Sequence, residues 1–223
     1  MSHPRLAGFL PDASRHNFYH SMHKALRLGH CRMLAELGAH DYARAEDTAT
    51  MLQKLRELIG LDRAHHDGET REIHAALETR QPGSTAQAAE DHAHHEQAFA
   101  ELESLIRAVD VAIASRRPLA GQALYHRYAL FAAADMEHMY AEETEVLSAL
   151  HAAFSDAELI AIEARMVGAI AAPEMAAYLS LVVPALNQGE RAAFLTRMRT
   201  ALPDMAFAGM LAESDQVANR VIS

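Results

Sequence analysis

Apolar residues recur along the chain at the three- and four-residue spacing of one helix face, and short polar breaks separate the periodic segments. The pattern predicts four long helices before residue 155, from Ser14 to Gly38, Asp47 to about Glu78, Ser84 to about Arg116, and about Leu119 to Phe154. Shorter helices are predicted beyond them, at roughly 156–171, 173–186, 188–201 and 204–220.

Two helix starts have the form of a capping box, in which a hydroxyl residue is followed three positions later by Glu or Gln. They are Ser84 with Gln87, and Ser155 with Glu158. Because short connections make consecutive helices antiparallel, we expect residues 1–154 to form an all-α, up-down-up-down four-helix bundle. Residues 155–223 are expected to form a helical extension that packs on the bundle or in a homodimer interface.

The composition supports helices and removes several classes of function. Helix-forming Ala, Leu, Glu, Arg and Met dominate, and Trp is absent. The net charge of −10 disfavours a nucleic-acid partner. A single cysteine, Cys31, excludes an internal disulfide framework and a cysteine-built zinc site. The sequence has neither a long apolar run nor a signal-peptide core, so we expect a cytoplasmic protein that does not span a membrane.

The histidine content points to chemistry. The chain has 15 histidines, and histidine is the commonest metal ligand in proteins. Several of them lie close together in the sequence, at positions His65, His66, His74, His92, His94 and His95. We therefore interpret this region as a candidate metal site.

An internal repeat marks the strongest ligand candidates. The pattern D-x-x-H-x-x-x-E-x-x-E-[IV]-x-x-x-L occurs twice at a constant offset, once in the second predicted helix and once in the fourth. Residues four apart share a helix face, so the His and the first Glu of each copy can reach one point. The pairs are His65 with Glu69, and His138 with Glu142. A nitrogen and a carboxylate oxygen from each helix suit iron, manganese or zinc.

The other two long helices supply further candidates. The first offers histidines on one side, including His20 and His23, and the third offers His92 and His95 with Glu96 one turn from His92. Asp62 and Asp135 each precede a repeat histidine by three residues, where they can accept the outer N–H of its ring. The competing interpretation is that these side chains are ordinary surface or core residues of amphipathic helices, but the duplicated pattern weighs against it.

The ordered set of motifs resembles the hemerythrin-like family, also called HHE cation-binding domains. The resemblance covers roughly residues 15–152 and rests on HKALR at His23, HHDGE from His65, DHAHHEQ around His92 and HMYAEE at His138. It implies a four-helix bundle with a non-haem diiron centre, two irons per chain, and two bridging carboxylates. The ligands it implies are His23, His65, Glu69, His92, His138 and Glu142.

One position departs from the oxygen carriers of that family. They have a second histidine one turn after the first on the third helix, whereas this chain has Glu96 there. Glu96 can replace the missing histidine as a ligand, or His95 can take its place. Otherwise one iron has one ligand fewer than in the oxygen carriers. His20 is the alternative to His23. The departure disfavours simple oxygen transport.

Three classes of function fit this site. The first, which we favour, is a binding protein that takes up oxygen or nitric oxide, or that stores or senses iron. The second is a diiron redox enzyme that acts on peroxide, nitric oxide or damaged iron centres. The third is a bundle in which the metal only stabilises the fold. The sequence contains no nucleophile elbow, phosphate loop or dinucleotide fingerprint, so it does not support an enzyme for organic substrates.

Overall fold

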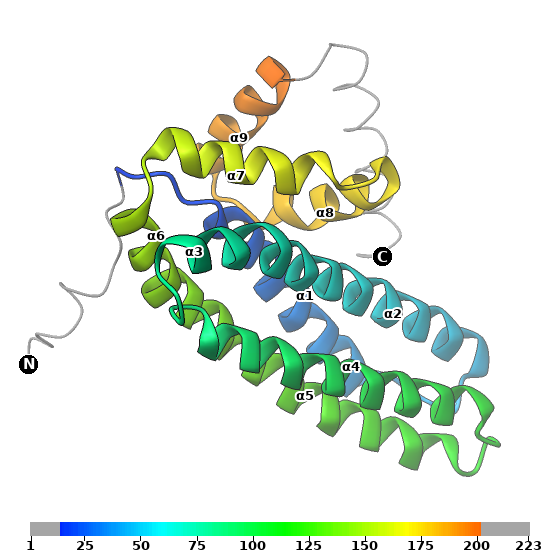
Figure 1. Cartoon of the computed structure of the whole chain (residues 1–223). Helices are drawn as coiled ribbons and strands as arrows, with labels where there is room; N and C mark the ends of the chain where they lie inside the picture. Colours follow the sequence, from blue (N-terminus) through cyan, green and yellow to red (C-terminus); the bar gives the residue numbers. More distant parts are fainter. Residues whose placement is uncertain (1–13, 202–223) are drawn as a thin grey trace, which may run out of the picture. The chain divides into compact units, whose positions relative to one another are not determined.

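The computed structural model describes residues 14–201, and every regular element in this range is helical (Figure 1). The predicted all-α class is confirmed, and the helix predicted at 204–220 lies outside the described residues. The α-helices in chain order are α1 (Tyr19–Ala39), α2 (Ala45–Gly68), α3 (Ala75–Arg80), α4 (Ala86–Val111), α5 (Arg117–Ala141), α6 (Leu147–Ala153), α7 (Asp156–Gly168), α8 (Ala172–Ala185) and α9 (Gln188–Ala201).

Two of the long predicted helices are continuous runs that each contain one π-helical segment. The run α2–α3 contains η1 (Glu69–His74), and the run α5–α6 contains η2 (Glu142–Val146). Both segments begin at the glutamate that the sequence repeat marks as a ligand. In a π-helix the hydrogen bonds span five residues, so the segment rotates the face that the following residues present. The sequence periodicity did not predict either segment.

The described residues form two compact units. The first contains residues 14–19 and 33–169, and the second contains residues 20–32 and 170–201. Helix α1 therefore contributes to both. The domain boundary predicted at residue 154 stays a prediction.

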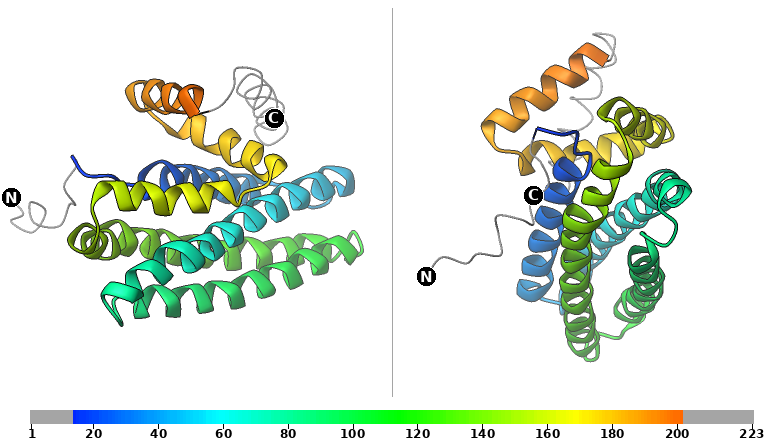
Figure 2. Two further views of the ribbon diagram at one scale, coloured as in Figure 1. Left: turned by 45° about the horizontal axis from the view of Figure 1, so that its top comes forward. Right: turned by 60° about the vertical axis from the view of Figure 1, so that its left-hand side comes forward.

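In the first unit, α4 and α5 lie side by side along their length, and α2 packs against α4 (Figures 1 and 2). The apolar positions of the two repeat copies meet in one buried cluster, which α7 also joins. Its members from these three helical runs are Ile73, Leu77, Val146, Leu147, Leu150, Leu159 and Ile162. The second half of the repeat thus builds core, while the first half carries the polar residues.

The start of α7 has the predicted capping box. Glu158 accepts hydrogen bonds from the backbone N–H and the hydroxyl of Ser155, both at 2.8 Å. Arg80, at the end of α3, donates to the same carboxylate over 2.5 Å. This arrangement ties the end of α3 to the start of α7.

The capping box predicted at Ser84 with Gln87 is wrong. The N-cap of α4 is Thr85, one residue later, and its side chain makes no capping bond. Glu78 of α3 instead accepts hydrogen bonds from the backbone N–H groups of Gly83 and Thr85, at 2.7 and 2.9 Å. A carboxylate from the preceding helix fixes this turn, so the local capping motif is not used.

In the second unit, Glu190 connects α9 to the His20–Arg32 part of α1. Its carboxylate lies 2.6 Å from Lys24 Nζ and 2.9 Å from His20 Nε2. Asn187 and Glu190 also cap α9 reciprocally, because each side chain accepts the other residue's backbone N–H. Helix α8 buries Tyr178, Leu179 and other apolar residues.

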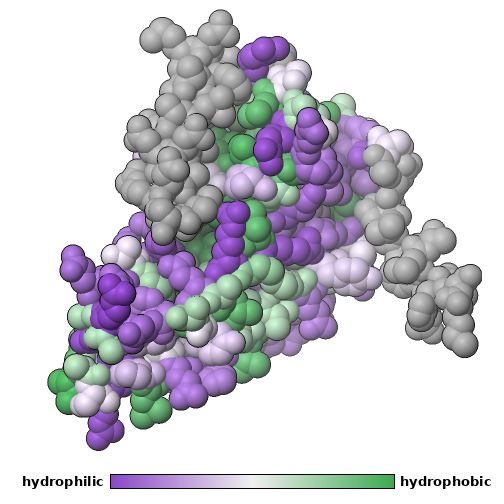
Figure 3. All heavy atoms as spheres, turned by 180° about the vertical axis from the view of Figure 1, so that it is seen from behind, coloured by the Kyte–Doolittle hydropathy of each residue, from purple (hydrophilic) through white to green (hydrophobic). Residues whose placement is uncertain are grey.

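No single helix within residues 14–201 is long and apolar enough to cross a membrane. Helices α7 and α8 together would have the length and the apolar composition, but the pair is bent by 117°. On the face shown in Figure 3, hydrophilic residues surround small groups of hydrophobic ones.

A glycine in α5 allows a close approach that can be tested. A Cβ atom at Gly121 would lie 2.5 Å from ring atoms of Tyr42, whereas a Cβ at Gly60, on α2, would meet no atom within 4 Å. We expect Gly121→Ala to lower the free energy of unfolding by about 1–3 kcal/mol through overpacking. The control Gly60→Ala should raise it by about 0.5–1 kcal/mol, because alanine favours the helix. Urea unfolding followed by circular dichroism measures both, and equal effects would contradict the contact.

The Glu158 cap predicts a pH dependence. The hydrogen bonds from Arg80 and Ser155 lower the pKa of Glu158 from its ordinary 4.5 to about 2. A folded-state pKa below the unfolded one means that the stabilisation is present above pH 4.5 and is lost as the pH falls through 2. Glu158→Gln should therefore destabilise the protein at pH 7 but match the wild type near pH 2. The control is Glu145→Gln, on the exposed side of η2. Urea unfolding measures the stability, and a Glu158→Gln variant whose unfolding midpoint at pH 7 equals that of the wild type would contradict the prediction.

Candidate metal centre

The two repeat glutamates are buried in the interior of the first unit. Glu69 is 0% exposed and Glu142 is 1% exposed, and each begins a π-helical segment. π-helical turns inside α-helices occur frequently at functional sites. Burying a carboxylate is costly unless a cation or hydrogen-bond donors neutralise it.

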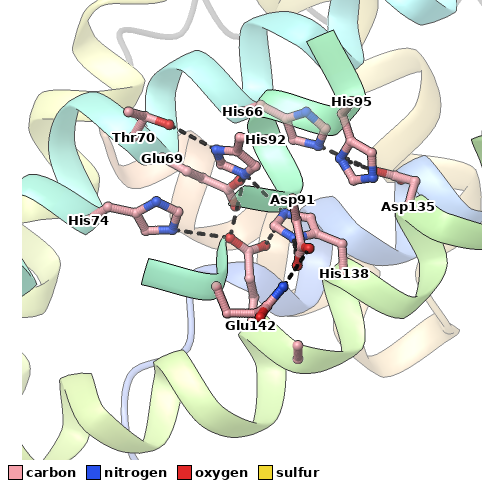
Figure 4. A network of polar contacts seen from close by, with 12 residues as sticks. His66, Glu69, Thr70, His74, Asp91, His92, His95, Asp135, His138 and Glu142 are labelled. Carbon is pink, nitrogen blue, oxygen red and sulfur yellow. Dashed lines mark hydrogen bonds and ion pairs between the residues drawn. The ribbon is translucent and has the colours of Figure 1, made fainter. Parts of the chain in front are cut away.

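Two histidines meet these glutamates. One ligand atom from each of Glu69, His92, His138 and Glu142 lies within 4.8 Å of all the others (Figure 4). His92 Nε2 lies 3.6 Å from Glu69 and 3.9 Å from Glu142, and His138 Nε2 lies 3.4 Å from Glu142. Bonds of about 2.1 Å to a metal would place neighbouring ligand atoms roughly 3.0–3.5 Å apart. The donor set and its spacing therefore fit one divalent ion.

Glu69 lies between two histidines. Its Oε1 is 3.0 Å from His65 Nε2, and its Oε2 is 3.6 Å from His92 Nε2. The two oxygens of one carboxylate therefore face different imidazoles, which is the orientation that a bridging ligand requires. His65 comes from α2 and His92 from α4, so Glu69 joins the two helices at the centre.

The outer ring nitrogens fix the orientation of His92 and His138. His138 Nδ1 lies 3.4 Å from Asp91 Oδ2, and an ionised carboxylate only accepts, so Nδ1 carries the proton and Nε2 presents a lone pair. His92 Nδ1 lies 2.8 Å from the Thr70 hydroxyl. The two Nε2 atoms are 2.9 Å apart, close enough for one proton or one metal ion to hold both. Such outer partners are typical of metal-binding histidines.

The buried charge changes the acidity of neighbouring groups. Burial, together with the charges of Glu142 and Glu69, raises the pKa of Tyr19 well above its ordinary value. Burial lowers the pKa of His92. Burial also opposes the charged form of His74, but its hydrogen bond to Glu142, 3.2 Å long, outweighs burial and raises its pKa. His74 therefore donates to Glu142 and offsets part of the carboxylate charge.

A second group of charges lies beside this centre. Asp62 and Asp135 are both 0% exposed, and Asp135 Oδ1 lies 3.2 Å from His66 Nε2. Burial opposes protonation of His66, but Asp62 and Asp135 outweigh it and raise the pKa of His66 to about 10. Burial lowers the pKa of His95 to about 4. The predicted bonds from Asp62 to His65 and from Asp135 to His138 stay predictions.

The structure brings most of the predicted ligands together in one unit. These are His65, Glu69, His92, His138 and Glu142. His23 is buried on the part of α1 that belongs to the second unit, and its role as a ligand stays a prediction. His20, in the same part of α1, is half exposed and pairs with Glu190.

The two candidates for the departing position on α4 lie in different surroundings. Glu96 is exposed and pairs with Arg63 over 3.0 Å. His95 is buried, and its Nδ1 lies 3.7 Å from Asp135. Of the two, His95 is the residue that the structure places in the interior.

Several residues of the site were missed by the sequence reasoning, namely His66, His74, Thr70 and Asp91. The sequence places His66 and His74 only in the histidine-rich region and not among the ligands, yet both are buried. In the second repeat copy their positions hold Met139 and Leu147, so a comparison of the copies could not reveal them. Helical spacing could have revealed His66, because Asp62, His66 and Glu69 lie at intervals of four and three residues and therefore share one helix face.

A cavity of about 400 Å³ reaches the histidines from the α4–α5 side. His95 and His138 line it, together with the charged residues Asp91, Arg127 and Glu137. Of Glu69, His92, His138 and Glu142, His138 is the residue that lines this cavity.

The chain was compared with protein-family models, with curated proteins and with solved structures, and none of the three comparisons gives a match.

Asp91 provides a test of the centre's outer partners. Asp91→Asn removes the charge that orients His138, so we expect metal affinity to fall by about 10–100-fold while saturating metal still fills the site. The control is Glu90→Gln, at the exposed neighbouring position on α4. Competition with a chromogenic chelator measures both affinities, and an unchanged affinity for Asp91→Asn would remove Asp91 from the site.

Proposed function

We propose that this protein is a hemerythrin-like metal protein: a four-helix, up-down-up-down bundle that holds two non-haem irons and binds oxygen or nitric oxide, or senses or stores iron. The observation that carries the proposal is the set of two imidazoles and two carboxylates contributed by Glu69, His92, His138 and Glu142, of which all but the partly buried His92 are buried. The ordered sequence motifs that resemble the hemerythrin-like family support the same conclusion.

The residues present divide naturally between two ions. His92, His138 and Glu142 would hold one, and His65 would contribute to the other. Glu69 would be shared, because its two oxygens face His65 and His92. Imidazole with carboxylate is a donor set that suits ferrous and ferric iron. Bound iron would supply a site for diatomic ligands and one-electron redox chemistry.

The protein's own groups shape what happens at such a site. His74 holds Glu142 in place through its hydrogen bond. Burial and the two glutamates raise the pKa of Tyr19 above its ordinary value, so its phenol stays protonated also in mildly alkaline solution. The α4–α5 cavity gives a diatomic molecule access to the side of His138.

The cavity also separates the binding hypothesis from a purely structural one. Structural metal sites are closed by protein ligands, whereas sites that bind ligands keep an open approach. Since His138 lines a cavity, a ligand-binding role is favoured over a metal that only stabilises the fold.

The test is iron content followed by ligand addition. Anaerobically loaded protein should contain two irons per chain, and Glu142→Gln should lose at least one, because it removes a negatively charged ligand. Glu145→Gln, on the exposed side of η2, is the matched control. Undiminished iron in Glu142→Gln, measured by plasma emission, would exclude Glu142 from the site.

The second half of the test concerns the ligand. Adding oxygen or nitric oxide to the ferrous protein should produce new visible absorption that the Glu142→Gln variant lacks. Reversal of the oxygen spectrum under vacuum would indicate binding, and irreversible oxidation with turnover of peroxide would indicate the redox enzyme instead. A spectrum that neither gas changes would contradict both.

A further inference from the structure

Four buried residues beside the proposed diiron centre form a second cluster. Asp62 and His66 come from α2, His95 from α4 and Asp135 from α5, all within the first unit. Each is at most 5% exposed. Figure 4 shows His66, His95 and Asp135 directed toward one another from these three helices. The proposed diiron centre uses none of the four as a ligand.

The distances match those between the ligands of one ion. His66 Nε2 lies 3.2 Å from Asp135 Oδ1 and 3.8 Å from Asp62 Oδ1, and His95 Nδ1 lies 3.7 Å from Asp135 Oδ1. One ligand atom from each of His66, His95 and Asp135 lies within 4.8 Å of the other two. Nitrogen and oxygen ligands bound at about 2.1 Å are separated by roughly 3.0–3.5 Å, so small side-chain shifts would close a coordination shell.

The cluster brings two carboxylates close together. Carboxylate oxygens of Asp62 and Asp135 lie within 4.8 Å of each other, and both side chains are fully buried. Like charges this close repel strongly where water does not screen them. A cation held by His66, His95 and Asp135 would offset this repulsion.

His95 gives an independent observation. Its Nδ1 is buried and has no hydrogen-bond partner, yet it faces Asp135 across 3.7 Å. If Nδ1 carries a proton, a buried donor is unsatisfied. If it does not, a lone pair faces a carboxylate oxygen. A cation bound by the Nδ1 lone pair and by Asp135 would satisfy both atoms.

We propose that His66, His95 and Asp135 form a second site for a first-row divalent metal ion, next to the proposed diiron centre. Two imidazole nitrogens with a carboxylate suit zinc, manganese or ferrous iron. His95 lines the α4–α5 cavity, so the ion has an entry path, and Asp91 and Glu137 give the cavity acidic groups that attract cations. Arg127 also lines the cavity but is paired with Glu101 over 2.6 Å.

Zinc alone is the probe for the experiment. The full chain is stripped with a chelator, titrated with zinc, passed through a desalting column and analysed for bound metal. Asp135→Asn and His95→Ala should each lose one zinc per chain relative to the wild type. The matched controls are Asp67→Asn and His94→Ala, which change exposed neighbours of His66 and His95 and should lose none.

A Glu142→Gln background separates the two sites. This variant weakens the proposed diiron centre, and the zinc that it retains should disappear on adding Asp135→Asn. Circular dichroism verifies folding, and the near-isosteric Asp135→Asn keeps the test valid if His95→Ala does not fold. The inference is overturned if Asp135→Asn binds as much zinc as the wild type, or if Glu142→Gln alone abolishes all zinc binding. The iron and oxygen measurements on Glu142→Gln remain a separate test of the proposed function.

Discussion

The first unit is organised around four buried carboxylates. Glu69, Glu142, Asp62 and Asp135 are each at most 1% exposed, and an isolated ionised carboxylate in such surroundings would cost several kcal/mol. Every one of them has an imidazole nitrogen within 4 Å. The clustering of histidines along α2 and α4 is therefore a consequence of where the acids lie. Cations, whether protons on histidine or bound metal ions, are a condition for this interior to be stable.

The sequence repeat divides this task between its two halves. The Asp, His and Glu positions supply the charged interior, and the following apolar positions, such as Ile73 and Val146, enter the hydrophobic cluster with α7. A π-helical segment separates the halves in both copies, beginning at Glu69 and at Glu142. Because such a segment rotates the helix face, it allows one continuous helix to direct a carboxylate into the centre and still bury the apolar residues that follow.

The sequence predicted those parts of the site that obey helical spacing within one element. The all-α class, the pairs His65–Glu69 and His138–Glu142, and the box at Ser155 all follow from intervals of three or four residues. Contacts between helices have no such signature, so the approach of Asp91 to His138 was not predicted. The failed box at Ser84 has the same cause, because Glu78 of the preceding helix took over the capping role.

The repeat also concealed a difference between its two copies. His66 and His74 correspond to Met139 and Leu147, which are buried and apolar. The α2–α3 run therefore carries polar neighbours for both charged groups, while the α5–α6 run presents apolar side chains at the same positions. Two equal copies would place two additional imidazoles, or two additional apolar groups, around the carboxylates. Because the copies are unequal, the α5–α6 run packs apolar side chains at these positions, and the α2–α3 run supplies hydrogen-bond donors to the carboxylates. This division allows a charged centre and a hydrophobic core to occupy the same pair of helices.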